Sequence, residues 1–141
     1  MKLEFNHKEY LEIRSSDHGT AGIGYDCQLT LGFQSEYVQG QTETWVDGPE
    51  MEQFIEQLRM VEKTLSGEAT LSATSPDELL IELTPIDLLG HYSFKIKTGH
   101  RYFVHSKMSI ASAEAEFPVY GQQVIEICIS LASYFESKLS A

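Results

Sequence analysis

The chain has 141 residues, of which 42% are apolar and 11% aromatic, and its formal net charge is −11. This length and composition fit one folded domain with its own core, so we predict a single domain over residues 1–141 and exclude a disordered chain. The strong negative charge disfavours direct binding to nucleic acid, whose phosphates it repels.

The N-terminal third has the period-two pattern of β-strands. Polar and apolar residues alternate over Tyr25–Phe33, which predicts a strand with one buried face. Shorter strands are expected at Lys2–Phe5 and Tyr10–Arg14, followed by a loop over Ser15–Gly22. A fourth strand is expected at Tyr37–Val46. Because it has polar residues on both faces, we expect an edge strand or a half-exposed strand.

A helix is expected over about residues 49–66. Gly48 precedes Pro49 and is the expected cap, because a residue before proline avoids the α region. Apolar residues then recur at three- and four-residue steps, as they do along one face of a helix, and Gly67 is the expected stop. The residues of this stripe are Met51, Phe54, Ile55, Leu58, Val61 and Leu65.

After this helix the period of two returns. It is found at Ala69–Ala73, Leu79–Leu83 and Tyr92–Ile96, with turn-forming residues between these segments. It is found again over His100–Phe117, a run that we expect a bulge or loop near Lys107 to divide. An antiparallel meander is the simplest interpretation.

Pro118 is expected to end this run, and a second amphipathic helix should cover about residues 121–139. The predicted order is four strands, a helix, four strands and a helix. Runs of strands that are each closed by a helix indicate an α+β fold with antiparallel sheets, about eight strands and two amphipathic helices.

Cys27 and Cys128 fall at inward-facing positions and lie too far apart in sequence for a disulfide framework, so we read them as buried thiols. This suits a reducing compartment. No charged segment followed by a long apolar run opens the chain, and neither a secretory signal nor a membrane span is expected. The predicted location is the cytoplasm.

The chemistry-bearing residues show no recognised catalytic or metal-binding spacing. The five histidines lack ligand spacing, and His100 and His105 would face opposite ways on one strand. There is no nucleophile elbow, phosphate loop or dinucleotide fingerprint, since the segment from Gly22 to Gly24 supplies only a G-x-G before a strand. We therefore expect no metal, no cofactor and no enzymatic activity.

Carboxylates are so abundant, at 21 acids, that some will lie close together by chance. Pairs that could act as acid and base therefore carry little weight, and the only basic cluster is interpreted as a solvated sheet face. The acid–base candidates are Asp17 with His18, Asp26, Glu82 and Asp87, and the basic cluster is Lys95, Lys97, Arg101 and Lys107.

Almost all of the excess negative charge lies in the middle third of the chain. Between Glu36 and Asp87 there are twelve acids against only Arg59 and Lys63, a balance of −10. A field of this sign attracts basic partners, although the acids could equally serve solubility alone. The first interpretation predicts that a basic protein binds to exposed acids. The candidate partner-binding residues are Glu36, Glu43, Asp77, Glu78 and Glu82, with Glu52 and Glu56 of the helix in reserve.

Much of the chain resembles a known family. It reads W-V-D-G-P-E-M-E-Q-F-I-E-Q-L-R-M-V from Trp45, S-G-E-A-T-L from Ser66 and E-L-L-I-E-L-T from Glu78, followed by a strand over Gly90–Lys97 and a closing helix. In this order the segments resemble the WapI-like bacterial immunity proteins, which are related to contact-dependent toxin systems. The shared motifs are structural, so no functional residue is carried over.

The resemblance implies a non-enzymatic cytoplasmic protein that binds and blocks the toxic domain of a secreted or cell-surface protein. Several toxin domains of this class cut nucleic acid and are therefore basic, which suits an acidic inhibitor. Two alternatives stay open. One is a structural module, including a homodimer built through a strand edge, and the other is a small-ligand or carbohydrate-binding domain with a pocket lined by Trp45 and tyrosines.

Overall fold

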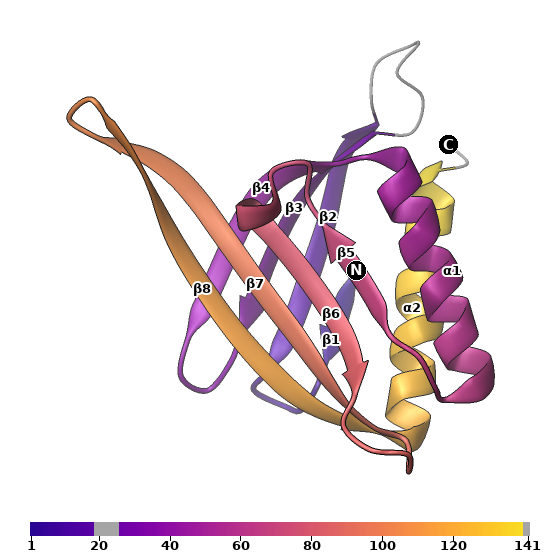
Figure 1. The fold of residues 1–141 in the computed structure, drawn as a ribbon. Helices are drawn as coiled ribbons and strands as arrows, with labels where there is room; N and C mark the ends of the chain where they lie inside the picture. The colour runs from indigo at the N-terminus through magenta and orange to yellow at the C-terminus, as the bar shows by residue number, and fades with distance from the viewer. Residues whose placement is uncertain (19–25, 140–141) are drawn as a thin grey trace.

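The structure, a computed structural model, describes residues 1–18 and 26–139. Two four-stranded antiparallel sheets face each other, and two helices pack together along one side of them (Figure 1). The first four strands form one sheet and the last four form the other, each in chain order. The α+β class, the antiparallel sheets and the predicted order of strands and helices are therefore confirmed.

The first sheet consists of β1 (Lys2–Glu4), β2 (Tyr10–His18), β3 (Cys27–Gln34) and β4 (Gln39–Val46). Alternate residues of β3 are buried, as predicted, and β4 is the edge strand, because among the described residues it pairs with β3 alone. The predicted loop after residue 14 is partly wrong. β2 continues to residue 18 by pairing with β3 across an irregularity, and residues 19–25 of the predicted loop and strand lie outside the described residues.

Helix α1 (Gly48–Thr64) buries its apolar stripe, but both of its ends differ from the prediction. The cap is Asp47, whose backbone is extended, and Gly48 is already helical. The helix stops before Gly67 because Leu65 adopts the left-handed conformation, with φ of 48°. Leu65 packs its side chain against the core, and this contact offsets the cost of a conformation that usually favours glycine.

The second sheet consists of β5 (Ala69–Ser72), β6 (Leu79–Pro85), β7 (His91–Val104) and β8 (Lys107–Tyr120). A short 3-10 helix, η1 (Pro76–Glu78), precedes β6. The inner face of the second sheet buries apolar residues from all four of its strands against the first sheet and the helices.

The β7–β8 hairpin differs from the prediction in two ways. β7 runs unbroken to Val104, so it joins the predicted strand at Tyr92–Ile96 to the first part of the predicted run over His100–Phe117. The predicted division near Lys107 is confirmed, as a tight turn at His105 and Ser106. Pro118 does not end the run but pairs with Ser93 inside β8. Proline is tolerated there because β8 is an edge strand with one side free of sheet partners.

Helix α2 (Gly121–Leu139) packs on α1, and the rings of Phe54 and Phe135 meet edge to face at 5.9 Å between centroids. Cys27 and Cys128 are both buried, as predicted, and burial raises the pKa of the Cys128 thiol to about 12. Neither helix of the described chain is long and apolar enough to cross a membrane.

Candidate functional site

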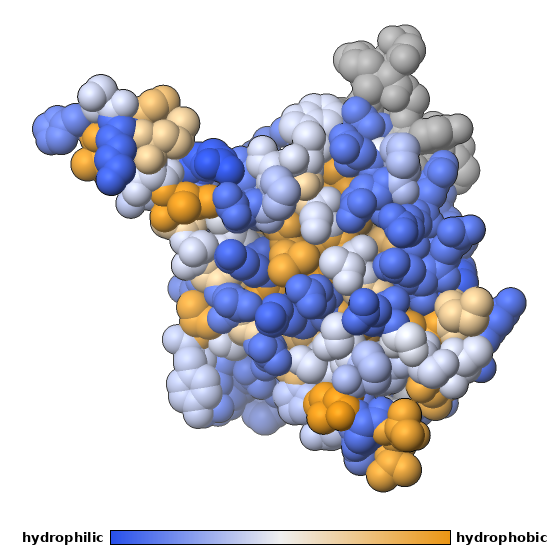
Figure 2. Space-filling model, in the orientation of Figure 1, coloured by the Kyte–Doolittle hydropathy of each residue, from blue (hydrophilic) through white to orange (hydrophobic). Residues whose placement is uncertain are grey.

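A long hairpin projects from the body of the protein. The pairing of β6 with β7 ends at Thr98, and beyond it β7 pairs only with β8, out to Val104 and Lys107. We call residues 99–112 the arm; it stands clear of the body with mixed hydrophobic and hydrophilic atoms at its surface (Figures 1 and 2). Its exposed apolar residues are Tyr102, Phe103, Val104, Met108 and Ile110, with Phe103 68% exposed.

The root of the arm is held against β4 by close backbone approach. Thr42 Oγ1 donates a buried hydrogen bond of 3.0 Å to the carbonyl oxygen of Gly99. A Cβ atom at Gly40 would lie 2.8 Å from the Cβ of Ala113, and one at Gly99 would collide with the backbone of Asp77. Two glycines therefore let β4, η1 and the arm pack this closely.

Charged side chains tie the arm to the body at the same place. Arg101 of the arm lies 3.5 Å from a carboxylate oxygen of Asp77 and 3.5 Å from one of Glu78. Thr44 Oγ1 donates a hydrogen bond of 2.7 Å to Glu78, which links the pair to β4. These contacts fix where the arm leaves the body.

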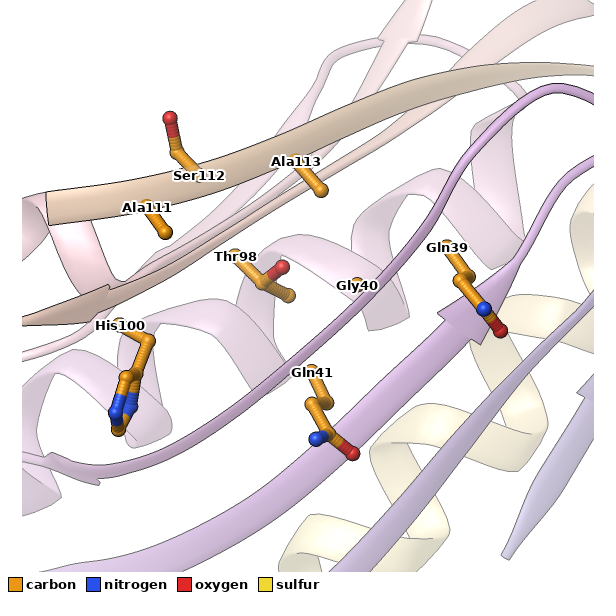
Figure 3. A pocket seen from close by; sticks show the side chains of 8 residues that line it. All are labelled: Gln39, Gly40, Gln41, Thr98, His100, Ala111, Ser112 and Ala113. Atoms are coloured by element: carbon orange, nitrogen blue, oxygen red, sulfur yellow. The ribbon is translucent and has the colours of Figure 1, made fainter.

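A groove lies beside this root, along the free edge of β4. It consists of two adjoining hollows of about 450 and 430 Å³ that share Gln41 and His100. β4 forms one wall and the β7–β8 hairpin forms the other, where the small residues Ala111, Ser112 and Ala113 leave room (Figure 3). We call it the edge groove. Its β4 wall consists of Gln39, Gly40, Gln41, Thr42 and Glu43.

The backbone of β4 offers hydrogen-bonding groups to the edge groove. The carbonyl of Trp45 points away from β3, because it accepts a bond of 2.8 Å from the N–H of Thr74. Alternate residues of a strand direct their N–H and C=O groups to the same side, so those of Gln39, Gln41 and Glu43 point to the free edge. No backbone bond across that edge reaches these three residues from the described part of the chain. The edge can therefore accept a further strand.

A second hollow, which we call the helix groove, lies between the two helices. It has a volume of about 640 Å³ and is lined by Pro49, Glu52, Gln53, Ile55, Glu56 and Glu136. Glu52 and Glu56 are exposed, and neither forms an ion pair within residues 1–18 and 26–139. The groove is therefore a concentrated negative surface.

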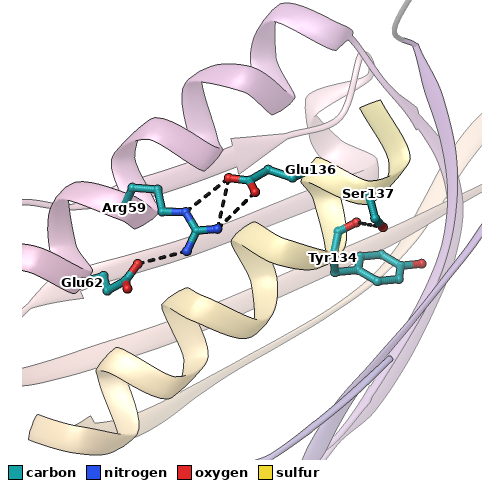
Figure 4. Close-up of polar contacts among 5 residues, drawn as sticks. All are labelled: Arg59, Glu62, Tyr134, Glu136 and Ser137. Carbon is teal, nitrogen blue, oxygen red and sulfur yellow. Dashed lines mark hydrogen bonds and ion pairs between the residues drawn. The ribbon is translucent and has the colours of Figure 1, made fainter. Parts of the chain in front are cut away.

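Arg59 lies beside this surface, because it binds Glu136 of the groove lining. Its positive charge is already paired with two carboxylates. Two hydrogen bonds of 3.1 Å from its Nη2 to Glu136 bridge α1 to α2, and a bond of 3.1 Å from its Nη1 reaches Glu62 within α1 (Figure 4). The pKa of Arg59 is raised, first by the hydrogen bond to Glu62 and then, against the opposing effect of burial, by that to Glu136. Among the described residues, neither Glu52 nor Glu56 forms an ion pair with Arg59 or with another cation.

The structure places the five predicted partner-binding acids in three separate regions. Glu43 lines the edge groove, and Asp77 and Glu78 hold Arg101 at the root of the arm beside it. Glu36 lies in the β3–β4 turn, where its N–H donates to a β1–β2 turn carboxylate. Glu82 lies opposite a lysine on the outer face of the second sheet. The five acids therefore do not form one patch.

That lysine belongs to the basic cluster, which is partly neutralised as expected. Lys95 lies 3.4 Å from Glu114 and 3.9 Å from Glu116. Its pKa is raised by a hydrogen bond to Glu114 and by the charges of Glu114 and Glu82. The outer face of the second sheet is thus a mixed ionic surface rather than a cationic one.

Three acid–base candidates have described side chains, and no two of them contact each other; they are Asp26, Glu82 and Asp87. Asp26 accepts a bond of 3.2 Å from the N–H of the first α1 residue. Asp87 accepts from the N–H of Leu89 at 2.8 Å and contacts His91, and its pKa is lowered, mainly by the Leu89 bond. Asp26 therefore binds the start of α1, and Asp87 stabilises the β6–β7 turn. The side chains of residues 17 and 18 lie outside what the structure describes, and the described residues hold no group of three or more potential metal ligands.

Sequence reasoning missed both the arm and the edge groove. The available signal was the run of Tyr102, Phe103 and Val104, because three consecutive apolar residues do not fit a strand with one buried face. Trp45, expected to line a ligand pocket in one alternative, is 42% exposed and lines neither groove. In comparisons with protein-family models, curated proteins and solved structures, none matched this chain.

Proposed function

We propose that this protein is a non-enzymatic, cytoplasmic immunity protein, which neutralises a basic toxin domain by binding it on an acidic surface. The observation that carries the proposal is the helix groove, in which Glu52 and Glu56 are exposed without a neutralising cation among the described residues. A toxin domain that cuts nucleic acid needs a basic groove for phosphates. An acidic surface would attract that groove at long range and cover it.

The five acids Glu36, Glu43, Asp77, Glu78 and Glu82 are part of the same proposal but are expected to contribute less. Asp77 and Glu78 already interact with Arg101, and Glu82 lies beside Lys95. Glu36 and Glu43 are exposed and far less engaged with cations. We therefore expect charge reversal at Glu36 and Glu43 to weaken binding, by less than reversal in the helix groove.

The test uses the toxin domain encoded beside this gene. The double variant E52K/E56K should bind that domain at least about tenfold more slowly at low salt, since exposed charges act mainly on the encounter rate. Rising salt should reduce the difference in association rate between the wild type and E52K/E56K, because charges are screened over about 8 Å at physiological ionic strength. Association and dissociation rates are read by surface-based kinetics, and protection by growth of cells that co-express the toxin domain.

The matched control is E68K/E126K, which changes the net charge equally at two exposed glutamates outside the helix groove. It should associate much faster than E52K/E56K. The proposal fails if no toxin gene adjoins this one, or if the toxin domain stays toxic in cells that hold abundant folded protein. It is also contradicted if both double variants slow association equally, because net charge alone would then explain the effect.

A further inference from the structure

The arm is a two-stranded hairpin with exposed apolar side chains on both faces. Opposed pairs of the arm place Phe103 with Met108 and Arg101 with Ile110 on one face, and Tyr102 and Val104 lie on the other. All of these side chains are exposed, and a two-stranded hairpin alone is at best marginally stable. Exposed apolar patches of this kind mark interaction sites.

The charge of the arm is opposite to that of the body. Residues 99–112 contain Arg101, Lys107 and two histidines but no acid. The remaining chain holds 21 acids against eight lysines and arginines, a formal charge of −13. The arm therefore suits an acidic surface, and a basic toxin domain would repel it.

The edge groove supplies the complementary surface. At the free edge of β4, the backbone groups of Gln39, Gln41 and Glu43 have no partner strand within the described residues, and there the arm likewise pairs only between its own two strands. Glu43 adds a carboxylate to the groove wall. The chain thus contains both a strand to donate and a place to receive it.

We propose that the occupant of the edge groove is the arm of a second copy of this chain, bound by strand addition to β4 in a reciprocal dimer. The groove adjoins the root of the arm, and in a dimer with a two-fold axis each copy would place its arm in the groove of the other. Such an arrangement uses the same surfaces on both copies and closes at two. It does not depend on the proposed immunity function, since it needs the purified chain alone.

The first test is sedimentation velocity over a concentration series at low salt. The wild-type chain should sediment as a dimer that dissociates on dilution, and added salt should weaken it. Phe103→Ser removes an exposed aromatic anchor and should raise the dimer dissociation constant at least about tenfold. Leu88→Ser is the matched control, because Leu88 is fully exposed in the β6–β7 turn, and it should leave the constant unchanged.

A second test distinguishes the edge groove from other acidic surfaces. Glu43→Lys and Lys107→Glu should each weaken the dimer. The first places a cation in the groove, where it repels the basic arm of the other copy. The second places an anion in the arm, where Glu43 of the other copy repels it. An equimolar mixture of E43K and K107E should associate more tightly than either variant, since each arm then meets a groove of opposite charge. Both side chains are exposed, so both variants should fold, and circular dichroism checks this.

A wild-type chain that is monomeric at a few hundred micromolar overturns the proposal and leaves the arm to an acidic partner of another kind. A dimer that persists in Phe103→Ser places the interface elsewhere and overturns it too. A mixture of the two charge variants that is no tighter than either alone contradicts arm-to-groove pairing.

Discussion

The body and the arm use the same residue type in opposite ways. Phe54 of α1 is completely buried and meets Phe135 across the helix pair, whereas Phe103 of the arm is 68% exposed. In the body, apolar residues from both sheets and both helices form one buried cluster. In the arm, Gly99 and Arg101 at the root contact the body, and beyond them cross-strand pairing holds the described chain. The body therefore carries the stability of the protein, and the apolar surface of the arm is available for contacts with another molecule.

The largest test of this contrast is Phe54→Ala against Phe103→Ala. Removing the buried ring should lower the free energy of unfolding by about 3 to 5 kcal/mol, because it leaves a cavity between the helices. Phe103→Ala should change it by less than about 0.5 kcal/mol at concentrations where the chain is monomeric. Urea unfolding followed by circular dichroism measures both. Equal urea midpoints for Phe54→Ala and Phe103→Ala would contradict the claim that the body, and not the arm, carries the stability.

A smaller effect is expected where the arm joins the body. Gly40→Ala would place a Cβ atom 2.8 Å from Ala113 and 2.7 Å from Phe33, which forces β4 away from the hairpin. We expect a loss of about 1 to 3 kcal/mol, as for overpacking in a core. In Gly32→Ala on the neighbouring strand, the nearest atom is 3.5 Å away, so no such loss should occur. Thermal unfolding compares the two, and a tolerant Gly40→Ala would mean that the root contact is loose.

An effect confined to alkaline pH concerns the thiol of Cys128. Burial raises its pKa from 9.0 to about 12, so the folded state holds this proton more tightly than the unfolded state. The resulting stability is present in full below about pH 9 and is lost as the pH rises towards about 12. Cys128→Ala should therefore flatten the fall in stability above about pH 9, measured by urea midpoints at several pH values. An unchanged alkaline slope would assign that fall to other groups.

The rate of labelling with a thiol reagent also compares the body with the arm. In the native wild type, Cys128 should react only after the structure opens, because it is buried and protonated. A cysteine placed in the arm by Ser106→Cys should react within the mixing time, since residue 106 is exposed in the turn. Fast reaction at both positions would show that the interior of the body opens readily.

The sequence predicted the parts of the fold in which burial repeats with a fixed period. Buried and less buried residues alternate along β3, and α1 has one apolar stripe, because each element buries one face. Both patterns were predicted. The helix ends were not predicted. Leu65 accepts a left-handed backbone because its side chain reaches the core, and that contact involves residues distant in sequence.

The candidate sites were less accessible from sequence for a similar reason. Acidic residues that are close in the chain, such as Asp77 and Glu82, lie in different surroundings, one beside the arm and one on a mixed ionic sheet face. Alternation also cannot tell where β7 loses its neighbour β6, because that depends on the length of another strand. The arm follows from the pairing of the strands, because it is the part of β7 and β8 that extends beyond the end of β6.

The pairing of strands in this fold bears on how the chain reaches it. Every strand of the described sheets pairs with a strand adjacent in sequence, so each sheet is a simple meander. Hairpins of this kind close in about 1 to 10 μs, and local pairings speed folding because little chain entropy is lost in forming them. Only the docking of the two meanders with their helices joins distant parts of the chain. We therefore expect that docking step, in which β4 meets β7, to limit the rate of folding.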